Sequence, residues 1–450
     1  MNKTGVFRLF ASALAALVVL LAVPGAVAKP PAKPAFKHNP VLFIHGIEGS
    51  GAQFESQKMR FMSNGYPRAW FDEVDYNSTR AVADKSEVHQ QIDDAIAALK
   101  QRTGQRRVDV VAHSLGTTVM YDYLTKGPTA AERRRNVGRY VNVDGQENNP
   151  GVPTLAVWAG RGEPGRHMDG AENVTIPNQT HVQACTSAEA FVEYFRFLTR
   201  RRPANDIVPQ SGSIEIAGKA LNFPENRGMA GATVEIWEVD DNGRRTSAAP
   251  LESLPIMDGS QGGGAWGPVT VEAGRRHEFA LVRSPSPTLH VYYEPFVRSD
   301  YTLRLLRSDA IETYAGLRPE SQSAVNIRYK ELWGDQGAES DHLLINGLNV
   351  CTPILCPISK QVNAFFAFDR NRDHQTDLSS PDPVLGRLPF IQGADVFIPG
   401  STPPDDVTSF QLLSRGAGPV RTLRTPNWES TNDGTIIQWN DFEQPSAPAD

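Results

Sequence analysis

The apolar positions in the first part of the chain alternate between short continuous runs and stripes at helical spacing. The runs that predict buried strands are 40–44, 70–76, 108–111, 140–143, 153–158 and 173–176. The helical stripes are Val88, Ile92, Ile96 and Leu99, and later Phe191, Phe195 and Leu198. We expect the second helix to open on a capping box of Thr186 and Glu189. This alternation up to about residue 202 predicts an α/β domain with a largely parallel sheet.

From about Asp206 the pattern changes to short β-rich runs separated by glycine and proline, without a long amphipathic helix. The runs with strand character are 213–217, 232–239, 269–272, 277–282 and 289–293. They predict an all-β domain, as a sandwich or barrel, over the rest of the chain. Two smaller β units in tandem are the alternative.

The N-terminus has the pattern of a secretory signal. Lys3 and Arg8 precede an apolar run from 10 to 23, and Ala26-Val27-Ala28 follows it. The run is too short for a comfortable membrane span, so a retained anchor is the less favoured alternative. We therefore predict a signal peptide at 1–28, a secreted or periplasmic location, and a disordered Pro-rich arm at 29–37.

Charge and cysteine usage narrow the class of protein. The net charge is −6 over 450 residues, and the basic run Arg200-Arg201-Arg202 is expected to be a solvated helix end, so a nucleic-acid partner is not indicated. Cys351 and Cys356 are close enough in sequence to form a small disulfide in an exported protein. The third cysteine, Cys185, is not part of this pair, and we expect it to be a buried, inert thiol.

The strand at 108–111 runs directly into Ala112-His113-Ser114-Leu115-Gly116, which is a nucleophile elbow in its A-x-S-x-G form. The sharp turn lifts the serine hydroxyl above the sheet, and the small residues Ala112 and Gly116 let the backbones approach closely. Ser114 is therefore the predicted nucleophile. A serine in an ordinary βα turn is the alternative.

The apolar run at 40–44 ends in His45-Gly46, the position that supplies one backbone amide of an oxyanion hole on such a fold. The amides of Ile47 and Leu115 are the predicted oxyanion donors. His45 is expected to hold the loop rather than to react.

A serine nucleophile needs a histidine base and an orienting carboxylate. His181 is the predicted base because it follows the last strand and precedes the last helix; the competitors are His89, His113 and His167, of which His113 would point away from the serine. The carboxylate is Asp144, which ends the strand at 140–143, or an acidic residue after the next strand, Glu163 or Asp169. The residues alone favour Asp144 only slightly.

The chain resembles the archaeal two-domain long-chain lipases and carboxylesterases, which join an α/β-hydrolase domain to a C-terminal β-barrel domain. The matching segments are HGIEGSGAQFESQKMRFMSNGYP (45–67), VDVVAHSLGT (108–117), VNVDG (141–145), GVPTLAVW (151–158), THVQACTS (180–187), DIVPQSG (206–212), YYEPFVRSD (292–300) and NGLNVCTPILCPI (346–358). The resemblance implies an α/β-hydrolase domain at 29–205, an all-β lipid-binding-like domain at 206–450, and a triad of Ser114, Asp144 and His181. It carries the oxyanion roles over to Ile47 and Leu115.

One departure from that family concerns the lid. The family has a long helical lid before the elbow, whereas only residues 77–87 separate the corresponding strand and helix here. We therefore expect no full lid and a more open site. Among aromatics of the β-rich part, Trp266, Tyr292, Tyr293 and Phe296 could wall an acyl groove, although core packing is the favoured role.

We expect the protein to be a secreted serine hydrolase of apolar carboxylic esters. The esters could be presented as single molecules, in lipid aggregates or at a polymer surface. Neither a metal nor an organic cofactor is needed. An amidase or an esterase of polyester or wall-linked acyl groups is the alternative on the same triad, and a non-catalytic secreted binding protein is the alternative of another class. The oxygen-rich segment 369–377 resembles part of a calcium loop, but His374 and Ser380 break the pattern, so a polar turn is favoured and no metal site is predicted.

Overall fold

The computed structural model describes residues 36–334, 337–416 and 418–442. The predicted signal peptide and most of the predicted arm lie outside these residues. Phe36, at the end of that arm, packs edge-on against Tyr66 and Trp70, with ring centroids 4.7 and 5.7 Å away. The expectation of disorder is therefore wrong at this position, because the ring is held by an aromatic cluster. No helix in the described ranges is long and apolar enough to cross a membrane.

The α/β region is built on a six-stranded sheet in the order β2-β1-β3-β4-β5-β6, with every neighbouring pair parallel. The strands are β1 (Val41–Ile44), β2 (Phe71–Val74), β3 (Val108–His113), β4 (Val137–Val143), β5 (Thr154–Ala159) and β6 (Glu172–Ile176). Because all strands run the same way, their carboxyl ends meet at one edge of the sheet, where α/β folds place their sites.

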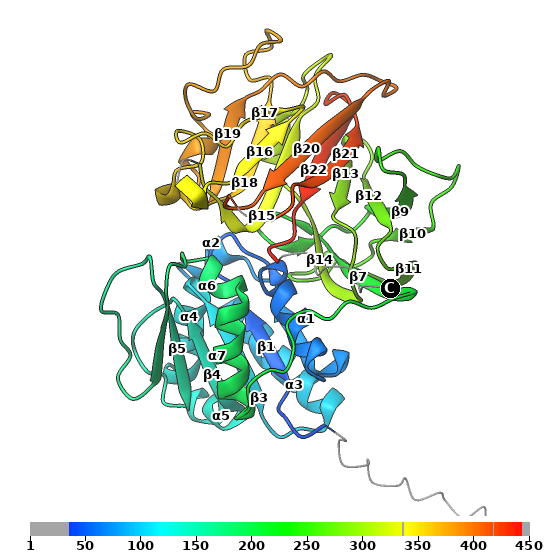
Figure 1. Cartoon of the computed structure of the whole chain (residues 1–450). Coiled ribbons are helices and arrows are strands. Elements are labelled where there is room, and N and C mark those ends of the chain that lie inside the picture. The colour runs from blue at the N-terminus through cyan, green and yellow to red at the C-terminus, as the bar shows by residue number, and fades with distance from the viewer. Residues whose placement is uncertain (1–35, 335–336, 417, 443–450) are drawn as a thin grey trace, which may run out of the picture.

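Helices cover both faces of this sheet (Figure 1). They are α1 (Glu55–Ser63), α2 (Ser78–Ala81), α3 (Ser86–Thr103), α4 (Leu115–Thr125), α5 (Ala130–Asn136), α6 (Gln183–Thr186) and α7 (Ala188–Thr199). Val111 of β3 packs into the core under α1 and α7, and its neighbour Val110 into the core under α3 and α4. The sequence prediction of a buried parallel strand is thus met residue by residue.

One predicted helix start is wrong by one residue. The cap of α7 is Ser187, whose hydroxyl accepts a hydrogen bond from the amide of Ala190, and not Thr186. Thr186 closes the short helix α6, which the sequence pattern did not reveal. Only 11 residues separate the end of β2 from the start of α3, and the only helix there is the four-residue α2. The predicted absence of a long lid agrees with this short connection.

The region after residue 206 forms three sheets and one α-helix within the described ranges. The largest has eight strands in the order β10-β9-β12-β13-β22-β15-β18-β19, and two four-stranded sheets flank it. The elements are β7 (Ser213–Asn222), β8 (Arg227–Gly228), β9 (Thr233–Val239), β10 (Glu252–Pro255), β11 (Ala265–Glu272), β12 (Arg276–Val282), β13 (Thr288–Tyr293), β14 (Asp300–Arg307), α8 (Asp309–Ala315), β15 (Ala324–Leu332), β16 (His342–Ile345), β17 (Leu348–Asn349), β18 (Val362–Phe368), β19 (Ile391–Asp395), β20 (Val407–Leu413), β21 (Arg421–Pro426) and β22 (Asp433–Gln438). The last strand, β22, lies between β13 and β15 and runs parallel to both, so the end of the chain joins the two halves of this region.

The β-rich region sits against the carboxyl edge of the parallel sheet, where β14 and β15 approach helices α1 and α6 (Figure 1). A buried ion-pair network joins the two regions. The guanidinium of Arg304 on β14 lies 2.8 Å from carboxylate oxygens of both Glu73 and Asp75, and Lys219 reaches Asp75 at 2.8 Å. Charges this deeply buried are costly unless fully paired, so the network favours one relative placement of the regions.

Several predictions about single residues can be compared with the structure. Cys351 and Cys356 form the predicted disulfide, and Cys185 is free and buried, with burial raising the pKa of its thiol. The side chains of Trp266, Tyr292, Tyr293 and Phe296 lie in hydrophobic cores, in agreement with the favoured role.

The segment at 369–377 contains a turn in which the Asp369 carboxylate accepts hydrogen bonds from the amides of Asp373 and His374. Across the described part of the chain, no cluster of three or more His, Cys, Asp or Glu side chains is arranged to hold a metal ion.

Candidate active site

Ser114 sits in the sharp turn between β3 and α4, with φ 52° and ψ −122°. A positive φ is strained for a residue with a side chain, and such strain at a strand-to-helix turn is typical of an exposed nucleophile. Gly116 explains how the turn closes: a Cβ at this position would lie 2.6 Å from the carbonyl oxygen of Ile44 and 2.5 Å from that of His45. The structure therefore forms the elbow that the sequence predicts.

Asp144 and His181 are brought together at the same edge of the sheet. His181 Nδ1 lies 2.6 Å from Asp144 Oδ2, while Asp144 Oδ1 accepts a hydrogen bond from the amide of Ala159 at 3.0 Å. Asp144 follows β4 directly, and the amide of Ser114 donates to the carbonyl oxygen of Val143 just before it. The sequence alternatives Glu163 and Asp169 are exposed on the loop after β5.

Sequence reasoning missed Arg166, which contacts the same carboxylate. Its Nη1 lies 2.8 Å from Asp144 Oδ1, it donates to the carbonyl oxygen of Gly145, and its guanidinium stacks over Trp158. Burial by itself would raise the pKa of Asp144, but hydrogen bonds from His181 and Ala159 and the nearby charges of His181 and Arg166 lower it. No motif marks Arg166, since it lies in an irregular loop.

His113 supports the loop that carries His181. Its Nε2 donates to the carbonyl oxygen of His181 at 2.9 Å, and the two ring centroids are 4.5 Å apart. Burial and the neighbouring His181 lower the pKa of His113 to about 3, so this ring is neutral. Phe390 lies beyond His181, with the two rings stacked at 6.5 Å. Among the described residues, the side chain of His181 is hydrogen-bonded to Asp144 and not to Ser114 Oγ.

Two backbone amides are suited to bind an oxyanion. Leu115 is the first residue of α4, and amides in the first turn of a helix have no acceptor within that helix. In the loop after β1, the amide of Gly46 donates to Gln53 and that of Glu48 to Ser78, whereas that of Ile47 has no hydrogen-bond acceptor among the described residues. The two predicted donors therefore have their N–H groups available.

His45 holds this loop in place. Its Nδ1 lies 2.7 Å from the carbonyl oxygen of Gly46, and its Nε2 accepts a hydrogen bond from the amide of Tyr76, whose ring stacks on the imidazole at 4.2 Å. Burial lowers the pKa of His45 to about 4, so the ring stays neutral. These contacts agree with a structural role for His45. The remaining competitors are also remote from Asp144: His89 contacts Val119, and His167 is exposed.

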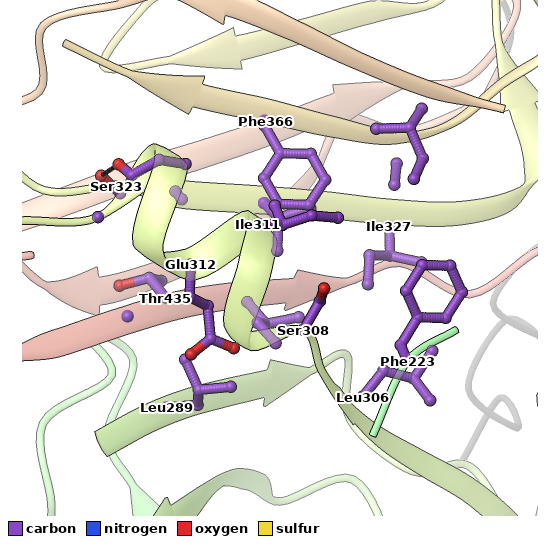
Figure 2. Close-up of a pocket in the computed structure, with 18 of the residues that line it drawn as sticks. Phe223, Leu289, Leu306, Ser308, Ile311, Glu312, Ser323, Ile327, Phe366 and Thr435 are labelled. Atoms are coloured by element: carbon purple, nitrogen blue, oxygen red, sulfur yellow. Dashed lines mark hydrogen bonds between the residues drawn. The ribbon is translucent and has the colours of Figure 1, made fainter. Parts of the chain in front are cut away.

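A mostly apolar cavity of about 160 Å³ lies in the β-rich region. One end is bounded by Glu48, Gly49 and Ser50, which follow Ile47, and by Phe390, which stacks on His181. The rest of the wall includes Phe223, Leu289, Leu306, Ile311, Ala324, Val325, Ile327, Ala364, Phe366 and Ile436. Helix α8 forms part of this wall, and Figure 2 shows its side chains Ile311 and Glu312 directed toward Phe366 and Leu289, respectively. An apolar cavity of about this size is known to take up an apolar ligand.

Three family models match successive segments of the chain. Residues 38–147 match the model described as lipase (class 2), and residues 212–310 match the lipase C-terminal domain. A third model, described as a C-terminal domain, matches residues 311–443.

Solved structures give weaker likenesses. The mature lipase from Bacillus licheniformis is 14% identical over 38% of this chain and 93% of its own, with a TM-score of 0.28. A carboxylesterase from Bacillus subtilis is 12% identical over 37% and 86%, with a TM-score of 0.27. A gene product from Listeria innocua is 12% identical over 38% and 97%, with a TM-score of 0.28.

The family models nevertheless agree with the order of elements along the chain. The lipase segment covers β1 to β4 with the elbow, and the lipase C-terminal segment begins with β7. The predicted fold class, an α/β-hydrolase region followed by a β-rich region, is confirmed. The chain matches a lipase model followed by a lipase C-terminal domain model, and at that level the resemblance found in its sequence is correct.

Proposed function

We propose that this protein is a serine hydrolase of apolar carboxylic esters and that Ser114, Asp144 and His181 form its catalytic triad. The observation that carries the proposal is the contact between Asp144 and His181 at the sheet edge where the strained Ser114 elbow also lies. A histidine with Nδ1 bound to a buried carboxylate leaves Nε2 for the proton of the nucleophile.

In the proposed reaction, Ser114 Oγ attacks the ester carbonyl carbon and His181 Nε2 takes up the hydroxyl proton. The amides of Ile47 and Leu115 bind the oxyanion of the tetrahedral intermediate. His181 then delivers the proton to the leaving alcohol, and an acyl-enzyme remains. Water attacks this acyl group with His181 again acting as base, and release of the acid restores Ser114. The serine–histidine hydrogen bond forms as substrate binds, since such bonds tighten in the Michaelis complex.

The acyl chain is proposed to enter the apolar cavity of the β-rich region. One end of the cavity is lined by Glu48, which follows Ile47, and by Phe390, whose ring lies 6.5 Å from that of His181, and its wall is made mainly of aliphatic and aromatic side chains. Burying methylene groups against such a wall stabilises the bound ester by about 0.8 kcal/mol for each methylene. This cavity favours a substrate with an apolar acyl group over the wall-linked alternative.

The proposal includes export and a lid-free site. The pattern of residues 1–28 is typical of a cleaved secretory signal, and the disulfide of Cys351 and Cys356 suits an oxidising compartment. The catalytic unit is proposed to span residues 29–205. The short α2 connection supports weak or absent interfacial activation, because no long helix is available to uncover the site.

A p-nitrophenyl ester series from acetate to palmitate tests the proposal on the mature protein. We expect hydrolysis of the series, stoichiometric labelling by a fluorophosphonate, and loss of both in Ser114→Ala, by about 10⁴-fold or more in kcat. A folded Ser114→Ala variant within tenfold of the parent would exclude Ser114 as the nucleophile. A parent protein that neither hydrolyses esters nor takes the label would instead support the binding-protein alternative.

A further inference from the structure

The loop that carries His181 is held by a side chain from the other region of the molecule. Glu331, on β15, is fully buried, and its Oε1 accepts hydrogen bonds from the amides of Val182 and Gln183 at 3.0 and 3.2 Å. The hydroxyl of Thr180 donates to the same oxygen. One carboxylate oxygen therefore binds the residues immediately before and after His181.

The backbone of Glu331 is in turn held by Arg415. The guanidinium of Arg415 donates to the carbonyl oxygens of Lys330 and Glu331 at 2.5 Å, and it also reaches Gln183 Oε1 at 3.3 Å. Arg415 is ion-paired with Asp341 and packs 3.4 Å over the Trp333 ring. The end of β15 thus presents a rigid acceptor to the backbone that follows His181, at the start of α6.

We propose that Glu331 is a positioning residue for catalysis, which sets the backbone of the His181 loop so that the imidazole faces both Asp144 and Ser114. This inference rests on the proposed role of His181. The side chain of Glu331 is hydrogen-bonded to the loop and touches neither substrate nor a reacting atom. It acts through the histidine.

Two features distinguish this positioning role from stabilisation of the contact between the α/β region and the β-rich region. The buried Arg304 network already joins them at β2, away from the His181 loop. The carboxylate of Glu331, by contrast, hydrogen-bonds residues on either side of the base, and its other oxygen lies 3.9 Å from Arg415. A displacement of about 1 Å in a catalytic group can lower the rate by about 10²-fold, so an acceptor at this position controls kcat.

The consequence is that the β-rich region is needed for the chemical step on every ester, and not only for long acyl chains. A protein truncated near Asp206 would lose the cavity and Glu331 together. Point variants are therefore required to separate the two contributions.

The experiment compares Glu331→Ala and Glu331→Gln in the full mature chain, with active sites counted by fluorophosphonate titration. We expect Glu331→Ala to lower kcat about 10- to 100-fold on both p-nitrophenyl acetate and palmitate, with KM within about twofold of the parent. Glu331→Gln keeps an acceptor oxygen and is expected to restore kcat to within about threefold. Rescue by glutamine and an equal loss on both esters are readouts that a merely stabilising residue would not give.

Glu294→Ala is the matched control, because Glu294 is another buried carboxylate of the β-rich region, bound to the amide of Asn440 and to Arg421. We expect it to lower the thermal midpoint while kcat per titrated site is unchanged. A kcat of Glu331→Ala within twofold of the parent, or an equal loss of kcat in Glu294→Ala, would overturn the proposal.

If Glu331→Ala does not fold, Glu331→Asp replaces it, since the shorter side chain draws the carboxylate away from the loop while keeping its charge. A parental kcat in Glu331→Asp would then overturn the inference. The variant His181→Ala distinguishes failure of the proposed function from failure of the positioning role. If His181→Ala is active, the proposed function itself is wrong. If His181→Ala is inactive while the Glu331 variants keep the parental kcat, only the positioning role is wrong.

Discussion

The α/β region and the β-rich region differ in where their functional residues lie along the chain. In the α/β region the proposed nucleophile Ser114 and acid Asp144 directly follow β3 and β4, and Ile47 is the third residue after β1. In the β-rich region the cavity wall and Glu331 come from β14, α8, β15, β18 and β22, which meet only through long-range pairing. Reactive groups at the ends of parallel strands can therefore be predicted from short sequence segments. Selection of the acyl chain length and positioning of His181 depend instead on residues that only the assembled fold brings together.

The largest expected effect tests the local part of this comparison. Asp144→Asn should lower kcat by about 10⁴-fold, the loss known for the corresponding change in a serine protease of another fold, because the imidazole loses its orienting carboxylate. Glu163→Gln is the control, since Glu163 is exposed on the loop after β5. Steady-state kinetics on p-nitrophenyl butyrate measure both. The reverse ranking would move the acid to Glu163.

The sequence predicted the first region well because its signals are short. The elbow needs only a strand, two small residues and a serine, and Gly116 meets the carbonyl oxygens of His45 and Ile44 as that motif requires. The choice between Asp144 and Glu163 was nearly open from the residues, because both follow strands, and the family resemblance decided it. The contact of Asp144 with His181 agrees with that choice.

Other features had no local signal. Arg166 and Glu331 lie far along the chain from their partners at 144 and 182, and each is linked by tertiary structure alone. The sequence pattern did not predict that the last strand, β22, pairs with β15. The helix start at Ser187 was missed by one residue because Thr186 and Ser187 are both good caps, and only the chain path selects between them.

The second prediction concerns stability of the β-rich region without a change in chemistry. Both ring nitrogens of buried His290 face carboxylates, Glu278 at 2.6 Å and Asp433 at 2.9 Å, and the ring stacks on Trp428. His290→Gln leaves Asp433 without a cation and Glu278 with Arg245 alone, and it should lower the free energy of unfolding by about 3 kcal/mol. Urea unfolding measures this loss, while kcat on p-nitrophenyl acetate should be unchanged.

The same substitution should show a defined pH dependence. Burial alone would lower the pKa of His290, but the hydrogen bonds to Asp433 and Glu278 raise it above the ordinary value. A raised pKa stabilises the folded state fully below the ordinary histidine pKa of about 6.5 and loses that effect as pH rises through the folded-state pKa. The difference between parent and variant should therefore shrink from pH 6 to pH 9. His342→Gln, at an exposed position, should show no such trend.

The third prediction separates acyl binding from the chemical step. Ala364 on β18 lines the cavity, so Ala364→Phe should exclude about two methylenes of a long acyl chain, at about 0.8 kcal/mol each. The kcat/KM on palmitate should fall roughly 10- to 30-fold, since 1.4 kcal/mol corresponds to tenfold. Acetate turnover should stay within twofold. Ala265→Phe, exposed on β11, is the control. An equal loss on both esters would place the acyl chain elsewhere.

The smallest expected effect concerns Arg166, which lies beside the Asp144–His181 pair. Its Nη1 lies 2.8 Å from Asp144 Oδ1, and its positive charge helps to lower the pKa of that carboxyl. Arg166→Gln removes this support for the carboxylate and should lower kcat on p-nitrophenyl butyrate by at most about fivefold, because a partly exposed charge pair contributes about 0.2–1 kcal/mol. Arg166→Lys should keep the parental kcat, and so should Arg161→Gln, which removes an arginine of the same loop that pairs with Glu339 instead. A loss of 100-fold or more in Arg166→Gln would instead mean that Arg166 is needed to orient Asp144, since a misplaced carboxylate no longer holds the imidazole.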